Sequence, residues 1–468
     1  MDFRTTPVAD LARSVQAKEI SARELAQAAL DRIGALDPTY NAFVAVDGER
    51  ALVEAAAMDE RIASGSDPGP LAGIPIGVKD TQDALGYRTT HGSVLFADAP
   101  AATTDNPFVA RLRAAGCVVV GKTNTPEFAW CANTANAVFG PTSNPFDTDR
   151  GPGGSSGGSA AALAAGMVPL ATGSDGGGSI RIPSACCGLS GMKPSLGRVP
   201  GGGTEPPGWL DLSTNGPMAR RIADVTRALD VAVGPDPTDL RALPRPEASW
   251  LAALEDPHVP VKVVWAPTLG YATVDAEVLA MCERAVGVIE SLGAEVTVVE
   301  SVFDADPVDD FLTLMGACQL RTMRPHMGHA RWEEVDPVLR LIVDNAESTT
   351  AEQLLGIFDR FHRMNLRLVE LFRKARILIT PTCSGVAPLV GDLMSTVNGE
   401  SEANWVQFTY PFNMTRSPAA TVCVGLSDGG LPVGLQLIGP QHGDLVVLRT
   451  AAALEAALDV DALATLPV

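Results

Sequence analysis

The chain has 468 residues, of which 46% are hydrophobic and 19% are charged, and its formal net charge at pH 7 is −20. This composition is typical of a folded globular protein and excludes a disordered chain. The excess of acidic residues would repel phosphate backbones, so nucleic acid is not expected as a direct partner.

Helices and strands alternate along the first part of the chain. The clearest helix begins at a capping box, in which Ser21 precedes Glu24 by three residues, and apolar residues then recur at helical spacing. The predicted elements are, in order, a helix over Ser21–Leu36, a buried strand over Leu71–Asp80, a helix followed by a strand over Phe108–Lys122, a loop over Phe139–Gly158, a helix over Ala160–Ala165 and a strand over Met167–Ala171.

A Pro-rich connection at 235–260 separates these elements from the later ones. The later part is predicted to contain strands over Val261–Trp265, Ala294–Val299, Arg376–Thr380 and Leu431–Ile438, helices over Asp275–Leu292 and Leu445–Leu458, and a mainly helical, polar segment at 308–376. We expect an α/β fold with a mixed central sheet covered by helices on both faces. It would form a single domain over 1–468, with a catalytic core at about 65–230 and 376–460 and a smaller, variable helical lobe at about 235–375.

Two clusters of glycine and serine stand out, PGGSSGGS at 152–159 and GSDGGGSIR at 173–181. Glycine lets the backbone approach a ligand closely and direct its N–H groups inward, which suits either a phosphate or a developing oxyanion. Neither cluster carries the Lys-Ser/Thr pair of a phosphate-binding loop, and no acidic residue follows at the spacing of a dinucleotide-binding site. An oxyanion site is therefore the better interpretation.

The strand at 71–80 ends in Lys79 and Asp80. Lysine is almost never fully buried without a partner, so a lysine on an apolar strand indicates a function. Glycines that only form tight turns would not account for the combination of this lysine with two serine-rich loops.

The segments IPIGVKD, GPGGSSGGSAAALAAGMVPLATGSDGGGSIRIPSACCGLSGMKPS and LPVGLQLIG together resemble the amidase signature family, and the similarity runs from about residue 20 to 460. The spacing of 24 residues between Ser155 and Ser179 (179 − 155) matches that of the two catalytic serines of the family. The resemblance implies that Ser179 is the nucleophile, that Ser155 is a bridging serine that follows a cis peptide bond after Gly154, and that Lys79 is the base.

This chemistry is reasonable for the residues present. A serine hydroxyl needs a base to become a nucleophile, and the six histidines lie outside any motif, which disfavours a Ser–His–Asp triad. Lys79 would need a pKa about 3 units below its usual value, which burial can supply. The eight cysteines have no C-x-x-C spacing, and no metal or organic cofactor is expected.

An amide substrate would form an oxyanion, which the backbone N–H groups of Gly176, Gly177, Gly178 and Ser179 are expected to hold. We expect Asp175 and Arg181 to orient this loop, with a surface ion pair as the alternative. The family position usually held by Thr or Ile is Gly176 here.

Substrate contacts are expected from aromatic residues and their neighbours, namely Ala129, Trp130, Trp209, Trp405 and Phe408. These residues suggest a substrate with an apolar or aromatic acyl or leaving group. The alternative is that the aromatic residues are buried in the core. Amides, esters and carbamates present the same electrophile, so the expected activity is that of an amidase, with esterase and urethanase activity also open. Trp405 and Val406 stand where the amidotransferases of the family have an acidic residue, which disfavours a charged amino-acid substrate.

Two other functions remain open. One is a glutamine-hydrolysing subunit of a larger amidotransferase complex, and the other is an inactive binding protein on the same fold. The sequence lacks a membrane-length apolar run and an export signal, so a cytoplasmic protein without a membrane partner is expected. A homodimer is among the assemblies open to it.

Overall fold

The computed structural model describes residues 1–204 and 206–466. Its centre is an 11-stranded sheet with the strand order β1-β3-β2-β4-β6-β5-β12-β13-β9-β7-β8. The strands are β1 (Phe43–Val46), β2 (Pro75–Lys79), β3 (Val118–Thr123), β4 (Leu170–Asp175), β5 (Ser190–Lys193), β6 (Thr214–Ala219), β7 (Lys262–Trp265), β8 (Glu295–Val298), β9 (Ile377–Pro381), β12 (Ala419–Leu426) and β13 (Pro432–Ile438).

The sheet is mixed, as the sequence predicts. Strand β2 runs parallel to both β3 and β4, and β7 runs parallel to β8 and β9. The strands between these two groups pair in antiparallel fashion, from β4 and β6 through to β13 and β9. A separate two-stranded ribbon joins β10 (Ser395–Val397) to β11 (Glu400–Glu402).

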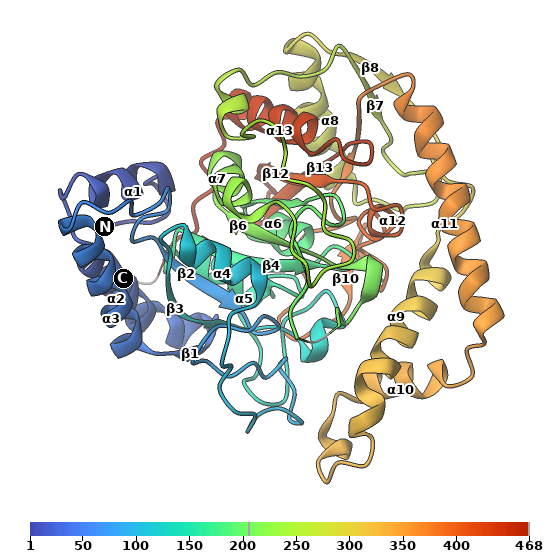
Figure 1. Ribbon diagram of the computed structural model, residues 1–468. Coiled ribbons are helices and arrows are strands. Elements are labelled where there is room, and N and C mark those ends of the chain that lie inside the picture. Colours follow the sequence, from blue (N-terminus) through green and yellow to red (C-terminus); the bar gives the residue numbers. More distant parts are fainter. Residues whose placement is uncertain (205, 467–468) are drawn as a thin grey trace.

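Helices flank the sheet (Figure 1). They are α1 (Val8–Gln16), α2 (Ala22–Tyr40), α3 (Gly48–Ala63), α4 (Pro107–Ala114), α5 (Gly157–Ala164), α6 (Arg181–Cys186), α7 (Ile222–Ala232), α8 (Ala276–Ser291), α12 (Pro411–Met414) and α13 (Asp444–Leu458). Helices α5 and α6 contact the central strands and are buried over their whole length. The burial of α5 explains its small, uncharged side chains around Ala160–Ala164. The predicted capping box of Ser21 and Glu24 is present at the start of α2.

Three helices form an arm beside the sheet, namely α9 (Val308–Met323), α10 (Pro337–Ala346) and α11 (Ala351–Phe372). They lie together at one side of the molecule in Figure 1, and α9 packs against both of the others. The arm has a small hydrophobic core of its own, which includes Leu314, Cys318 and Phe361 together with Tyr410 from the main body.

The structure differs from the predicted boundary of the helical lobe. Strands β7 and β8 and helix α8 fall within 235–375, yet the two strands complete the edge of the main sheet and α8 packs on β13 and β9. The reason is the pairing of β7 with β9, which lies more than a hundred residues later in the chain. The arm proper covers 308–372, in agreement with the helical segment expected there.

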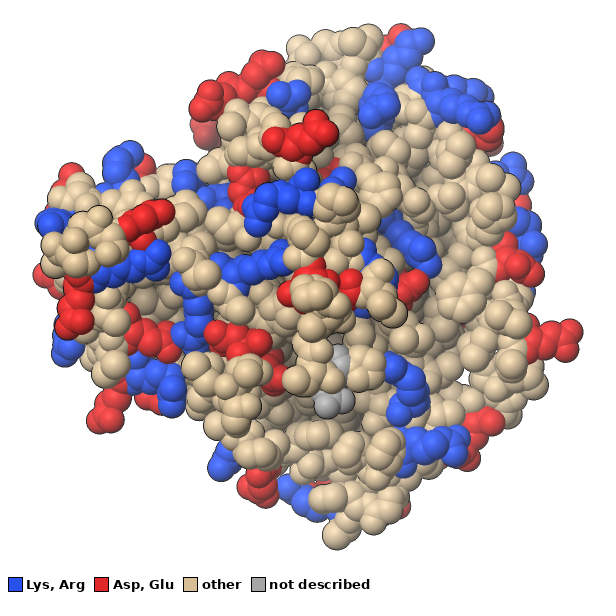
Figure 2. Space-filling view, in the orientation of Figure 1, with Lys and Arg blue, Asp and Glu red and all other residues tan. Residues whose placement is uncertain are grey.

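No helix in the described ranges is long and apolar enough to cross a membrane. On the face of the molecule shown in Figure 2, Lys and Arg side chains are interspersed with Asp and Glu, and no single sign of charge covers the surface. Acidic side chains therefore form no single patch on this face.

Candidate active site

Lys79 is the last residue of β2, and all five residues of that strand are buried. Its side chain has no exposed surface, and its Nζ lies 2.7 Å from Ser155 Oγ and 3.1 Å from Ser174 Oγ. Burial lowers the pKa of the Lys79 ammonium to about 7, although the nearby Asp175 carboxylate acts in the opposite direction. An amine with this pKa is partly neutral near pH 7 and can accept a proton.

Strand β4 supplies two hydroxyl groups to Lys79. Thr172 Oγ1 accepts a hydrogen bond of 2.9 Å from the backbone N–H of Lys79, and Ser174 Oγ contacts its Nζ. The two residues are separated by one position, so their side chains leave the same face of the strand. Sequence analysis missed Ser174, which lies inside the glycine-rich run, although this alternation would have identified it.

Ser155 lies in the loop that leads into α5, and the peptide bond between Gly154 and Ser155 is cis, as the resemblance implies. The Ser155 side chain is fully buried. The backbone N–H of Ser156 donates to the carbonyl of Ser179 over 3.3 Å. This hydrogen bond links the loop that carries Ser155 to the turn that carries Ser179.

Ser179 lies at the end of the turn between β4 and α6, and its side chain is half-buried. Within residues 1–204 and 206–466, its hydroxyl makes no hydrogen bond to Ser155. Hydrogen bonds between catalytic groups are often long before substrate binds, so the separation of the Ser179 and Ser155 hydroxyls is consistent with a proton relay that forms when substrate binds.

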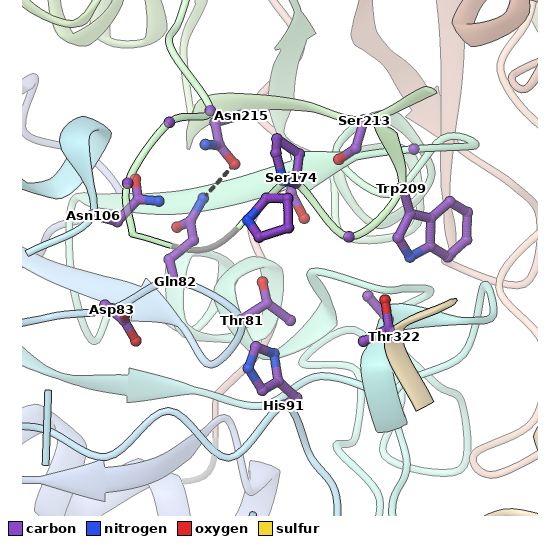
Figure 3. A pocket seen from close by; sticks show the side chains of 18 of the residues that line it. Thr81, Gln82, Asp83, His91, Asn106, Ser174, Trp209, Ser213, Asn215 and Thr322 are labelled. Atoms are coloured by element: carbon purple, nitrogen blue, oxygen red, sulfur yellow. Dashed lines mark hydrogen bonds between the residues drawn. The ribbon is translucent and has the colours of Figure 1, made fainter. Parts of the chain in front are cut away.

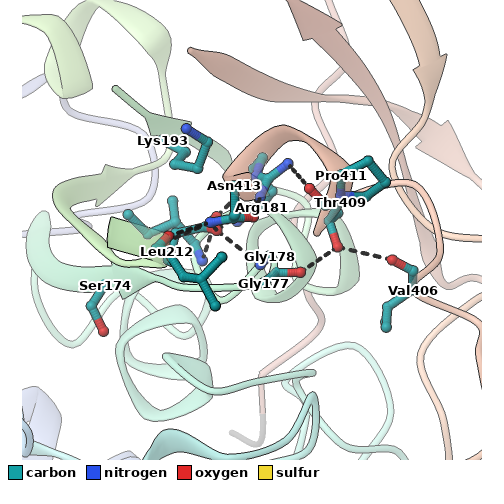
Figure 4. Close-up of polar contacts among 12 residues, drawn as sticks. Ser174, Gly177, Gly178, Arg181, Lys193, Leu212, Val406, Thr409, Pro411 and Asn413 are labelled. Carbon is teal, nitrogen blue, oxygen red and sulfur yellow. Dashed lines mark hydrogen bonds and ion pairs between the residues drawn. The ribbon is translucent and has the colours of Figure 1, made fainter. Parts of the chain in front are cut away.

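Asp175 organises this turn from the inside, and three of the residues that bind its carboxylate, Gly178, Arg181 and Asn413, are labelled in Figure 4. Its carboxylate accepts hydrogen bonds from the backbone N–H groups of Gly178 (2.8 Å) and Ile180 (3.2 Å) and from Arg181 Nη2 (2.8 Å). Burial by itself would raise the pKa of this carboxyl group, but the Arg181 guanidinium holds it below its usual range. Neither side chain is exposed, which rules out the alternative of a surface ion pair.

Arg181 extends this network to the carboxyl-terminal part of the chain. Its Nη1 donates to the Thr409 carbonyl (2.9 Å) and to Gln436 Oε1 (2.6 Å), and its Nη2 donates to Asn413 Oδ1 (2.6 Å). Asn413 in turn donates to Asp175 Oδ1 over 2.9 Å. The turn that carries Ser179 is therefore fixed by side chains from distant segments.

The structure corrects one of the predicted oxyanion donors. The N–H of Gly178 is bound to Asp175, so it does not point toward a substrate. Gly178 has a φ of 134°, and a Cβ at this position would collide with Thr409 and Ile182. In the described part of the chain, the N–H groups of Gly176, Gly177 and Ser179 have no protein acceptor and are free to bind an oxyanion.

Two cavities meet at Ser179. The polar cavity, with a volume of about 680 Å³, is lined by Ser155, Ser174 and Gly176 and by the polar side chains drawn in Figure 3. The apolar cavity, of about 610 Å³, is lined by Gly177 and by residues of the helical arm, and no Asp, Glu, Lys or Arg side chain lines it among the described residues.

Trp209 lies between the two cavities and lines both, together with Ala129. A Cβ on Gly176 would lie 2.7 Å from Trp209 Cε3, so the indole occupies the space that a side chain at 176 would need. Phe311 from α9 packs in the same way over Gly177, at 2.5 Å from a Cβ placed there. The arm also holds the Trp209 loop, because Arg321 Nη2 donates to the carbonyls of Pro207 (2.6 Å) and Gly208 (2.9 Å).

The other predicted substrate contacts differ in their positions. Trp130 lines the apolar cavity. Trp405 forms part of its wall but is only 1% exposed, and its indole N–H donates to the Leu393 carbonyl over 3.2 Å. Phe408 lines neither cavity, because it is fully buried in the main core, so the structure does not bring it to the site. Phe311 was missed by sequence analysis, which treated its helix only as part of the variable helical lobe.

His91, like His326, lines the polar cavity and therefore comes into question for an alternative triad. Its ring stacks on Phe128 with centroids 5.7 Å apart, and burial lowers its pKa. In the described residues its side chain makes no hydrogen bond to a serine, whereas Lys79 contacts two. No group of three or more His, Cys, Asp or Glu side chains in those residues is arranged to hold a metal ion.

Comparison with known proteins agrees with this geometry. The family model described as Amidase matches residues 24–448. An acylamidase of Rhodococcus erythropolis is 37% identical over 462 residues, which cover 96% of this chain and 94% of that protein. A glutamyl-tRNA(Gln) amidotransferase subunit of Carboxydothermus hydrogenoformans is 35% identical, with 95% of this chain and 96% of that protein covered.

Among solved structures, that of a bacterial aryl acylamidase belonging to the amidase signature enzymes superimposes with a TM-score of 0.92. The two chains are 29% identical, and the match covers 99% of each. The likeness therefore extends over the sheet, the flanking helices and the helical arm.

Proposed function

The chain belongs to the amidase signature family and is a hydrolase acting on amide bonds. From this premise we propose that Ser179 is its nucleophile. Ser155 and Lys79 form the relay that activates Ser179. The observation that carries the proposal is the contact of 2.7 Å between Lys79 Nζ and Ser155 Oγ, made by a fully buried lysine with a pKa of about 7.

In the proposed reaction, neutral Lys79 takes a proton from Ser155, which takes one from Ser179. The Ser179 oxygen attacks the amide carbon, and the N–H groups of Gly176, Gly177 and Ser179 hold the oxyanion. The carbon–nitrogen bond then breaks while Ser155 protonates the amine and recovers a proton from Lys79. Water hydrolyses the acyl-enzyme through the same groups. Loss of one oxyanion donor typically costs about 100-fold or more in rate.

We propose that the substrate carries an apolar or aryl group, because the apolar cavity next to Ser179 has no charged lining residue in the described part of the chain. The names of the acylamidase and aryl acylamidase relatives agree with such substrates. Esters and carbamates present the same electrophilic carbon, so we include both as further substrates.

A glutamine-hydrolysing subunit is the second candidate, since a glutamyl-tRNA(Gln) amidotransferase subunit is 35% identical to the chain. Glutamine would bring an ammonium and a carboxylate to the site, and buried charges need paired partners. The apolar cavity offers none among its described lining residues, whereas Asp83, Asp239, Arg241 and Arg321 line the polar cavity on the other side of Ser179. The apolar cavity therefore favours a hydrolase that acts on apolar amides, and the charged residues of the polar cavity keep glutamine as the second candidate.

The test is a screen of the purified chain against aryl amides, esters, carbamates and glutamine, followed by labelling with a fluorophosphonate. We expect turnover of the aryl amides and a label on Ser179, with both lost in Ser179→Ala. Hydrolysis of glutamine alone would support the amidotransferase alternative, and a label on another serine would contradict the assigned nucleophile.

A further inference from the structure

Helix α11 packs on the rest of the molecule through one face only. The residues buried on this inner face are Ile357, Phe361 and Leu368. The helix runs along the outer edge of the molecule in Figure 1, so its other face is turned to solvent. A surface helix normally carries polar residues on that face, and a row of large apolar residues there indicates contact with a partner.

Such a row is present on α11. Its apolar members have exposed fractions of 67% (Leu355), 40% (Phe358), 48% (Leu366) and 39% (Val369), and the exposed His362 lies between them. We refer to these five residues as the α11 stripe. Their spacings of three and four residues place them on one side of the helix, which is the pattern of a helix that packs against another helix.

The α11 stripe is symmetric about its central residue. Phe358 and Leu366 each lie four residues from His362, and Leu355 and Val369 each lie seven residues from it. Two antiparallel copies of α11 related by a two-fold axis at His362 would therefore bring Phe358 against Leu366 of the second copy. Leu355 would meet Val369 of the second copy in the same way. A two-fold interface requires this self-complementarity, whereas a partner of another sequence does not.

The charged residues beside the stripe fit the same arrangement. Two arginines of α11 form ion pairs with aspartates outside the helix (2.5 and 2.7 Å), but Asp359 and Arg363 form none within the described ranges. In the antiparallel pair, Arg363 lies at the level of residue 361 of the second copy, two positions from Asp359 there. Glu352 lies at the level of residue 372, next to Arg373, which also binds Glu370 within its own chain. Opposite charges therefore meet across the axis.

We propose that the chain forms a two-fold homodimer through an antiparallel pair of α11 helices. The α11 stripe forms the apolar centre of the interface, with His362 on the axis, and Asp359 and Arg363 form its charged rim. The inference is independent of the proposed reaction, because no residue of the stripe lines the cavities at Ser179.

The first experiment is sedimentation velocity of the full chain over a range of concentrations. Wild type should be a dimer, and Leu355→Asp should weaken the dimer at least about 100-fold, because a two-fold interface carries the substitution twice and each copy loses a buried leucine. The matched control is Val53→Asp, since Val53 is 69% exposed and lies on α3, at the opposite side of the molecule in Figure 1. This variant should remain a dimer.

Both variants change exposed residues, so thermal unfolding and amide hydrolysis should match wild type and show that the fold is intact. A wild-type chain that remains monomeric at all concentrations up to about 100 μM would overturn the inference and leave the stripe to a different partner. A dimer that Leu355→Asp leaves unchanged, or that Val53→Asp dissociates, would overturn it as well.

Cross-linking with a short bismaleimide tests the antiparallel register. His362→Cys should link to itself in the dimer, because a residue on the axis faces its own copy. The two copies of Leu355→Cys should not link, since they lie 14 positions apart along the pair (369 − 355), about 21 Å at 1.5 Å per residue. Wild type, whose eight cysteines are buried or half-buried, gives the background. Equal linking of both variants would indicate a parallel pair, and a dimer without a link at His362→Cys would exclude this interface.

Discussion

Lys79 acquires its chemical role from its position at the end of a fully buried strand. Burial removes water from the ammonium and lowers its pKa to about 7, and the two serine hydroxyls within 3.1 Å are its side-chain partners. Local patterns in the sequence, an apolar strand ending in lysine and two glycine-rich serine loops, indicated Lys79 and the two loops. The resemblance to the amidase signature family then singled out Ser155 and Ser179 as candidates within those loops.

Other features of the site depend on geometry that no local pattern contains. The N–H of Gly178 is bound by Asp175, which depends on how the carboxylate is oriented by Arg181. Phe408 was expected near the substrate, but its place in the core follows from the packing of the whole sheet.

Ser174 is expected to position Lys79 and to adjust its pKa. Its Oγ lies 3.1 Å from Lys79 Nζ and favours the charged amine, so Ser174→Ala should lower the pKa of Lys79 further and move the acidic limb of kcat/KM to lower pH. We also expect kcat/KM at the optimum to fall about tenfold, as for other groups that orient a catalytic residue.

Ser174→Thr is the matched control, because it keeps the hydroxyl and should restore both the rate and the position of the limb. The measurement is a pH–rate profile for the three proteins. A profile of Ser174→Ala that superimposes on wild type would show that the contact has no influence on Lys79.

At the scale of elements, the glycine turn at 173–179 and the loop that carries Trp209 fit closely together. Gly176 is not in a left-handed conformation, so its lack of a side chain is explained by the Trp209 ring, which lies 2.7 Å from a Cβ placed there. Gly176→Ala should displace the indole and lower kcat/KM about tenfold or more, since small displacements at a catalytic site are costly.

The double variant Gly176→Ala, Trp209→Ala checks this cause. If the clash with the indole is responsible, adding Gly176→Ala to Trp209→Ala should cost much less than adding it to wild type. Gly208→Ala, in the same loop but with no atom within 4 Å of its Cβ, should behave as wild type. Equal losses from Gly176→Ala in both backgrounds would exclude the indole as the cause.

Helices α1 and α7 are linked by a hydrogen bond from the backbone of Val8 to the side chain of Asp224. Asp224, only 5% exposed, accepts a hydrogen bond of 3.0 Å from the backbone N–H of Val8 at the start of α1, where no local side chain caps the helix. Burial raises the pKa of Asp224 to about 7, so between about pH 4 and 7 the folded protein binds more protons than the unfolded one. Wild-type stability is therefore reduced as pH rises through this window, by about 1.4 kcal/mol for each pH unit at most.

Asp224→Asn keeps the acceptor for Val8 and removes the charge. Its Tm should exceed that of wild type by more at pH 8 than at pH 5, and Asp224→Ala, which lacks the acceptor, should gain less. Thermal unfolding followed by circular dichroism measures the difference. A Tm difference that is the same at both pH values would contradict the raised pKa of Asp224.

Sequence patterns identified the hydrophobic strands of the fold better than the polar ones. Strands β2, β3, β9 and β13 coincide with predicted runs, because each is a short apolar segment bounded by turn residues. Strand β6 was not predicted, since Thr214–Ala219 contains Gly216 and Pro217 and acquires its strand conformation from pairing with β4 and β5 on either side. Similarly, the edge position of β7 and β8 depends on distant pairing.

At the scale of the whole molecule, the mixed sheet brings together segments that are far apart in the chain. Strand β2 places Lys79 beside β4 and the two serine loops, while Arg181 ties those loops to Thr409, Asn413 and Gln436. The helical arm adds Phe311 and completes the apolar cavity. On the face shown in Figure 2, acidic and basic side chains are interspersed.

The central claim is that neutral Lys79 activates Ser179 through Ser155, and a pair of pH–rate profiles tests it most directly. For wild type, kcat/KM for an aryl amide should fall on the acidic side with a midpoint near pH 7, because the amine with a pKa of about 7 becomes protonated there. Lys79→Ala should lower amide hydrolysis by orders of magnitude and abolish this acidic limb. Hydrolysis of the matching ester should suffer less, because an alkoxide or phenoxide leaves with less need of a proton. An acidic limb that persists in Lys79→Ala, or an equal loss for amide and ester, would contradict the proposed relay.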